Sequence, residues 1–141
     1  MTQNEKDLLV KDLSARLPYG VKVQTFRRHS EEDPTIIGYP YTLDFIMMSI
    51  MFKDNIEEYK PYLFPLSSMT EEQKNECFKG TPLEIDKYGD IVVKDNLYGG
   101  SQYTDLEIYL EVINWLLKNH FDIYGLIPMG LAIDATNKNI Y

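Results

Sequence analysis

Few side chains in this sequence have the chemistry that catalysis or metal binding requires. The 141 residues include one cysteine, Cys77, and two histidines, His29 and His120. A thiolate nucleophile needs an imidazole close by, but Cys77 sits next to Phe78 near the end of a predicted helix, where a thiol usually fills apolar space. Neither histidine has a second ligand at metal-binding spacing. The sequence therefore predicts neither a cysteine nucleophile nor a metal held by imidazole.

Carboxylates and glycines offer two weaker signatures. Asp86, Asp90 and Asp95 surround a predicted turn, but their order lacks the alternating oxygen ligands and terminal glutamate of an EF-hand loop, which favours a solvated turn. Gly-Gly-Ser at 99–101 precedes a predicted helix, as phosphate-binding loops do, yet no lysine follows in the Walker position. We therefore expect no metal and no cofactor.

The stretch YKPYLFPLSSMTEEQ, residues 59–73, raises the question of a serine nucleophile. Ser67 and Ser68 lack the Gly-x-Ser-x-Gly elbow that exposes such a serine. The other interpretation is a connector that two prolines hold extended and that ends where Thr70 starts a helix, with Gln73 completing a capping box. Ser68 and Glu71 offer the same box one register earlier. The connector is the favoured interpretation.

Composition and charge exclude several classes of protein. The 14 basic and 22 acidic residues give a net charge of −8, which repels phosphate backbones and anionic membranes, so direct nucleic-acid binding is disfavoured. No segment reaches the roughly 18 apolar residues of a membrane span, and the first residues do not resemble a signal peptide. With a single cysteine as well, we expect a cytoplasmic protein without membrane contact.

Hydrophobic periodicity and turn residues predict one α+β domain over 1–141, with a twisted antiparallel sheet and about three helices packed mainly on one face. Residues 35–52 are interpreted as a short strand, a turn and a central strand, with a buried helix over 43–52 as the alternative. The other expected elements are a helix over 5–17, a strand over 21–26, a polar loop over 27–34, a helix from Thr70 to about Lys79, a hairpin over 82–95, a helix from Thr104, and a loop-rich apolar tail over 121–134.

The aromatic content of 13%, with eleven tyrosines, exceeds what a core usually needs and fits partly exposed contact surfaces. We expect such a surface to draw on the 59–69 connector and the 121–130 tail. The expected contact residues are Tyr59, Tyr62, Phe64, Met69, Tyr124 and Met129.

Three stretches carry a resemblance to a known family: ARLPYGVK at 15–22, KPYLFPLSSMTEE at 60–72 and HFDIYGLIPMGLAID at 120–134. The chain resembles a family of small proteins of gut Bacteroides genomes and their prophages, for which no activity is established. The resemblance implies an accessory protein of a mobile element. Related sequences have arginine where this chain has Phe64, and a Tyr-Arg pair at 123–124, so an anion site there is not expected.

Taken together, these features favour a protein-binding or regulatory accessory protein of a bacterial or prophage genome, and the sequence leaves its partner and oligomeric state open. One alternative is a small enzyme that uses carboxylates, which requires a pocket with two convergent carboxylates of raised pKa. Another is an acidic decoy of a nucleic-acid-binding protein, which requires a one-sided acidic stripe. A binding module requires an exposed apolar patch.

Overall fold

The computed structural model describes residues 1–27, 36–37, 40–53, 55–94 and 106–141. Within these residues the fold is α+β, as predicted, with helices, short strands and 3₁₀ turns along the chain. The order is α1 (Gln3–Arg16), η1 (Leu17–Tyr19), β1 (Lys22–Arg27), β2 (Ile36–Ile37), β3 (Tyr41–Thr42), α2 (Phe45–Lys53), η2 (Ile56–Glu58), β4 (Tyr59–Leu63), η3 (Leu66–Ser68), α3 (Glu71–Phe78), β5 (Leu83–Ile85), β6 (Ile91–Val93), α4 (Leu106–Lys118) and β7 (Ile133–Asp134).

Helix α1 forms where the sequence predicts it, because two reciprocal hydrogen bonds between Thr2 and Glu5 cap its N-terminus. The Glu5 N–H donates to Thr2 Oγ1 at 3.2 Å, and the Thr2 N–H donates to a carboxylate oxygen of Glu5 at 2.6 Å. This capping box satisfies two of the amide groups that a helix start leaves free. The helix gives way to η1 and stops at Gly20, whose φ of +68° suits glycine.

The main sheet has the strand order β2-β1-β4-β7, with β3 also pairing with β1. Strand β1 pairs antiparallel with β4, with Val23 opposite Pro61. Strand β7 pairs parallel with β4, with Tyr62 opposite Ile133. A parallel pair needs a long crossover, which here is the whole stretch from η3 to the end of α4. The expected antiparallel pairing is therefore confirmed for β1 with β4 and is wrong for β4 with β7.

Residues 45–53 form helix α2, so the preferred interpretation of a central strand there is wrong and the alternative of a helix is confirmed. The N-cap is Asp44, whose carboxylate accepts from the Met47 N–H at 2.7 Å. Met48 and Met51 are buried. Apolar residues occur all around this helix, which removed the periodicity that distinguishes a helix from a strand covered on both sides.

The expected helix and hairpin after the connector are confirmed. Thr70 and Gln73 form the capping box of α3, and β5 pairs antiparallel with β6 around a turn at Gly89, where φ is +82°. The connector itself contains strand β4, which lies between β1 and β7 in the sheet.

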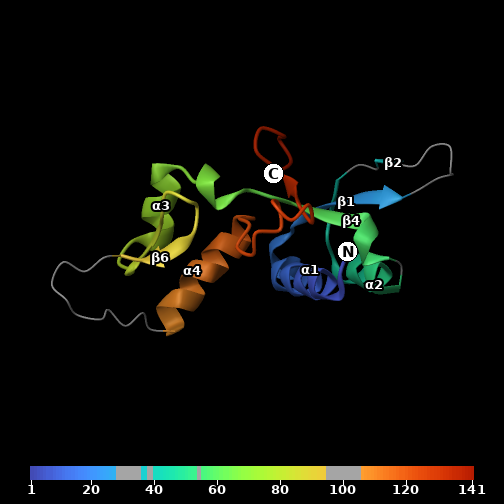
Figure 1. Ribbon diagram of the computed structural model, residues 1–141, viewed down its shortest axis with the longest axis horizontal. Helices are drawn as coiled ribbons and strands as arrows, with labels where there is room; N and C mark the ends of the chain where they lie inside the picture. The colour runs from blue at the N-terminus through green and yellow to red at the C-terminus, as the bar shows by residue number, and fades with distance from the viewer. Residues whose placement is uncertain (28–35, 38–39, 54, 95–105) are drawn as a thin grey trace.

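The core consists of two hydrophobic clusters at the two ends of the molecule. Figure 1 shows α1, α2 and the main sheet in one half and α3, the hairpin and α4 in the other, with β4 leading from one to the other. Leu9, Leu13 and Leu63 belong to the first cluster, and Leu116 and Phe121 belong to the second. The extent of a single domain over 1–141 stays a prediction.

Several predictions lie outside the described residues. They concern residues 28–34 of the polar loop, which include His29, and also Asp95, the glycines of 99–101 and the capping of the last helix at Thr104. Arg27 ends strand β1.

Candidate binding groove

Three of the six expected contact residues are buried. Tyr59, Tyr62 and Met69 are 1%, 7% and 5% exposed, because the connector enters the middle of the sheet instead of crossing its edge. The Tyr62 hydroxyl donates to the Gln24 side-chain oxygen at 2.7 Å, so even its polar group is used internally. These three side chains stabilise the fold and are not accessible to a partner.

The connector and the tail meet next to β4. The Phe64 N–H donates to the His120 carbonyl at 2.9 Å, and the Asp122 N–H donates to the Phe64 carbonyl at 2.8 Å. The rings of Phe64 and Phe121 lie 6.0 Å apart. Phe64 and Tyr124 are partly buried, and Met129 is 43% exposed.

Two adjoining hollows of about 370 Å³ and about 360 Å³ lie where the connector, the hairpin turn, α4 and the tail converge. They share four lining residues, Leu66, Asp90, Ile123 and Tyr124, and we describe them together as one groove with two halves. Three tyrosines line it, and we call it the tyrosine groove: Tyr88 from the hairpin turn, Tyr109 from α4 and Tyr124 from the tail.

The tyrosines present much of their surface to solvent. Tyr88 is 76% exposed and Tyr109 is 43% exposed. A lysine ammonium covers one face of two of the rings, with Lys87 at 5.0 Å from the Tyr88 ring and Lys11 at 5.1 Å from the Tyr124 ring. Such cation–π contacts help to hold the rings in place.

Aspartate side chains fix the backbone around the groove. One carboxylate oxygen of Asp86 accepts from the N–H groups of Tyr88 and Asp90, each at 2.9 Å, and so shapes the turn. Asp122 is buried and accepts from the N–H groups of Leu126 and Ile127, each at 2.9 Å, and so shapes the tail. Nowhere in the described ranges do three histidine, cysteine or acidic side chains come together as a metal site would need.

A buried ion pair on α1 holds the start of the tail, at Phe121, against this helix. Arg16 donates to both carboxylate oxygens of Asp12, at 2.7 and 2.8 Å, and to the Phe121 carbonyl at 2.6 Å. Both side chains are completely buried. Burial raises the pKa of Asp12 although Arg16 acts in the opposite direction, so the cost of removing this carboxylate from water outweighs the pairing. This pair was not predicted from the sequence, although its spacing of four places both residues on one helix face.

Of the residues with potential reactivity, Ser68 and His120 line one hollow of about 350 Å³ together with Tyr141, and Cys77 does not line it. Burial, with a smaller effect of Glu76, raises the pKa of the Cys77 thiol to about 12, which suppresses the reactive thiolate. Burial, with Arg16 and Lys22, lowers the pKa of His120 to about 4, and its ring stacks on Tyr141 at 3.8 Å. The Ser68 hydroxyl donates to the Pro65 carbonyl at 2.7 Å and closes a turn.

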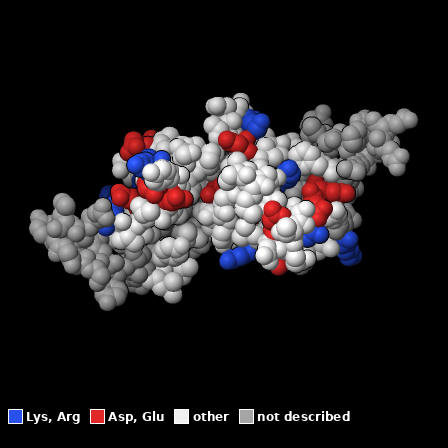
Figure 2. Space-filling view, in the orientation of Figure 1, with Lys and Arg blue, Asp and Glu red and all other residues white. Residues whose placement is uncertain are grey.

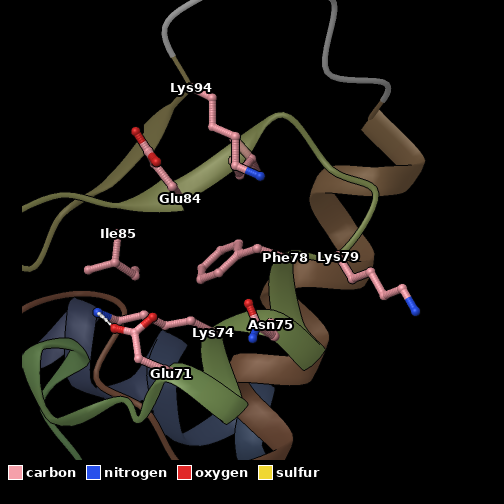
Figure 3. Close-up of a pocket in the computed structure, with 9 residues that line it drawn as sticks. Glu71, Lys74, Asn75, Phe78, Lys79, Glu84, Ile85 and Lys94 are labelled. Carbon is pink, nitrogen blue, oxygen red and sulfur yellow. Dashed lines mark hydrogen bonds and ion pairs between the residues drawn. The ribbon is translucent and has the colours of Figure 1, made fainter.

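A hollow of about 610 Å³, larger than either half of the tyrosine groove, lies elsewhere, between α3 and the hairpin. Figure 3 shows the Phe78 ring in the middle of it, Lys79 directed away, and Lys74 paired with Glu71, 3.4 Å apart. Two carboxylates line this hollow, Glu71 and Glu84. Asp12, whose pKa is raised by burial, does not line it.

Charged side chains on the face shown in Figure 2 gather over its two ends, with both signs interspersed, and the middle carries few of them. Comparison with Figure 1 shows the segment after α4 in this middle region. No described helix has the length and apolar character needed to cross a bilayer.

No protein-family model, curated protein or solved structure matches the chain. The resemblance to the Bacteroides family therefore stays a prediction, and the function has to be argued from the groove.

Proposed function

We propose that the protein is a binding module that holds an extended, proline-containing segment of a partner protein in the tyrosine groove. The observation that carries this proposal is the convergence of Tyr88, Tyr109 and Tyr124 around one hollow surface. Grooves lined by aromatic rings are a common way to bind polyproline-type helices, because flat rings pack against the proline rings and hydroxyl groups bond the free backbone carbonyls.

The charges around the groove favour an uncharged or mildly basic segment. Asp90 is exposed and lines both halves of the groove, while Lys87 and Lys11 lie over the faces of two rings. Against a net charge of −8 on the whole chain, an acidic segment would be repelled at long range. A regulatory role in a bacterial or prophage genome is proposed on the resemblance alone.

Binding can be tested with synthetic peptides. We expect a fluorescently labelled proline-rich peptide with one lysine to bind with a measurable change in anisotropy, and the same peptide with alanine in place of each proline to bind at least about tenfold more weakly. Tyr88→Ala should weaken binding about tenfold, the loss of roughly 1.4 kcal/mol that is typical of a contact aromatic.

Phe45→Ala is the matched control, because Phe45 is 75% exposed on α2 and Tyr88 is 76% exposed. The control variant should bind the peptide as the unmodified protein does. Equal affinity for the proline and alanine peptides, or an equal effect of the two variants, would contradict recognition in the tyrosine groove.

A further inference from the structure

The hairpin of β5 and β6 is a two-stranded sheet, so among the described residues no strand lies on the outer side of β5. The ladder between the two strands determines which backbone groups point outward. The Lys94 N–H donates to the Pro82 carbonyl at 2.6 Å, and the Asp86 N–H donates to the Asp90 carbonyl at 2.9 Å. Because bonded pairs alternate along an antiparallel ladder, Glu84 between them also bonds inward, to β6.

The backbone groups of Leu83 and Ile85 therefore point away from β6. The Leu83 N–H donates to Thr81 Oγ1 at 3.3 Å. The Leu83 carbonyl and the N–H and carbonyl of Ile85 have no hydrogen-bond partner among the described residues. We call these three groups the β5 edge. A row of free backbone groups of this kind is a template for another extended chain.

The β5 edge borders the hollow of about 610 Å³ between α3 and the hairpin. Leu83, Glu84 and Ile85 all line this hollow, and no residue of β6 does. Because successive side chains of a strand point to opposite faces, a hollow that three successive residues line runs along the outer edge of the strand. Figure 3 shows the Phe78 ring and the Ile85 side chain in the space between β5 and α3, where they give the hollow an apolar floor.

We infer that an extended segment of a partner protein occupies this hollow as a third strand beside β5. Its backbone bonds to the β5 edge, and every second side chain packs toward Phe78. Strand addition is a common way to bind extended peptides, because backbone bonds supply affinity and pockets for alternate side chains supply specificity. The volume of the hollow lies within the roughly 300–1,000 Å³ of typical binding pockets.

The charges of the hollow favour a segment with one acidic side chain. Lys74, Lys79 and Lys94 line it together with Glu71 and Glu84. Lys74 pairs with Glu71 at 3.4 Å, which leaves two lysines against one glutamate. This local charge acts at contact, whereas salt screens the negative charge of the rest of the chain beyond about 8 Å.

A second copy of this chain fits the β5 edge less well than a partner segment does. In the twofold pairing that uses both edges fully, Leu83 of one copy lies opposite Ile85 of the other, and the two exposed Glu84 side chains face each other. Like charges directly opposite destabilise a strand pair. Proline cannot donate to a ladder, so this segment also differs from the one proposed for the tyrosine groove.

Hydrogen exchange of the full chain tests the strand pairing. The probe is a capped peptide of alternating valine and threonine with one glutamate and no proline. We expect excess peptide to slow exchange of the Ile85 N–H at least about tenfold, because this group gains an acceptor. Unchanged exchange at millimolar peptide would overturn the inference. Protection of Ile85 that rises with protein concentration without peptide would assign the edge to a second copy and would also overturn it.

Two N-methylated versions of the peptide test the pairing on the unmodified protein. One version carries methyl groups on the backbone nitrogens of its odd residues, and the other carries them on those of its even residues. Only one of these two sets of N–H groups faces β5. We therefore expect one version to bind at least about tenfold more weakly and the other to bind as the parent peptide does. Equal affinities of the two versions would overturn the inference.

Ile85→Pro removes the outward N–H and leaves the bonds of the hairpin ladder in place, so it should weaken binding at least about tenfold. Val93→Pro is the matched control, because Val93 lies opposite Leu83 and its N–H points away from β5. The control should bind the peptide normally, and an equal effect of both variants would overturn the inference. Tyr88→Ala should also bind this peptide normally, so this proposal and that of the tyrosine groove fail independently.

Discussion

Removal of the Arg16 side chain should destabilise the protein more than any surface change, and Arg16→Met tests this. The side chain makes three short hydrogen bonds, two to Asp12 and one to the Phe121 carbonyl, and none of its surface is exposed. The substitution would leave a buried carboxylate without its cation. Breaking a buried pair in this way costs about 3–5 kcal/mol, a large part of the 5–15 kcal/mol that typically stabilises a domain.

The double variant Asp12→Leu with Arg16→Met should be less damaging than the single one. Burial raises the pKa of Asp12 despite Arg16, so the pair is not a net source of stability at neutral pH, and apolar replacements remove the desolvation cost. The Phe121 carbonyl still loses its donor, for which we expect about 1–3 kcal/mol. Urea unfolding followed by circular dichroism measures both costs.

Lys6→Met provides the matched control for this experiment. Lys6 pairs with Glu57 at 2.9 Å, but both side chains are about one third exposed, so we expect a cost of about 0–1 kcal/mol. A cost below about 1 kcal/mol for Arg16→Met, or a double variant as unstable as the single one, would refute the account of the buried pair.

Three further predictions concern titration and reactivity. Alkylation of Cys77 at pH 8 should be at least about a hundredfold slower in the folded protein than in urea, because burial raises the pKa of the thiol to about 12; similar rates would contradict this. The pKa of His120 is lowered from 6.5 to about 4, so only the unfolded state takes up this proton between those values and stability should fall as the pH falls from 6.5 to 4. The full pKa difference corresponds to about 3 kcal/mol of unfolding free energy, and because the ring is partly exposed we expect a loss of about 1–2 kcal/mol. Urea midpoints at several pH values measure this loss. It should be smaller in His120→Asn, because asparagine tolerates the φ of +65° at this position. Tyr141→Phe removes a hydroxyl that donates to the Tyr62 carbonyl at 2.7 Å and accepts from the Lys22 N–H at 2.9 Å, which should cost about 1–3 kcal/mol in thermal unfolding; an unchanged midpoint would show that water replaces both bonds.

The features that the sequence predicted correctly depend on neighbours along the chain. The capping box at Thr70 and the glycine turn of the hairpin each involve residues within a few positions of one another. Helix α2 was interpreted as a strand because its apolar residues face both the core and the solvent, and periodicity cannot separate these cases.

The role of the connector and the location of the groove depend on contacts between distant parts of the chain. The two prolines predicted an extended connector over 59–66, but β7 pairs with Tyr62 and Leu63, beyond Pro61, and β4 lies inside the sheet as a strand. Of the expected contact residues, Tyr124 lines the groove and Met129 does not, whereas Tyr88 and Tyr109 enter the groove from the hairpin and from α4. No local pattern shows that these segments meet.

The most direct test of the tyrosine groove is a nuclear magnetic resonance titration of the labelled full chain with the proline-rich peptide. We predict amide shifts that cluster at Tyr88, Asp90, Tyr109 and Tyr124, with those of α2 unchanged. Shifts that instead cluster between α3 and the hairpin, or no shifts at millimolar peptide, would contradict the proposed function.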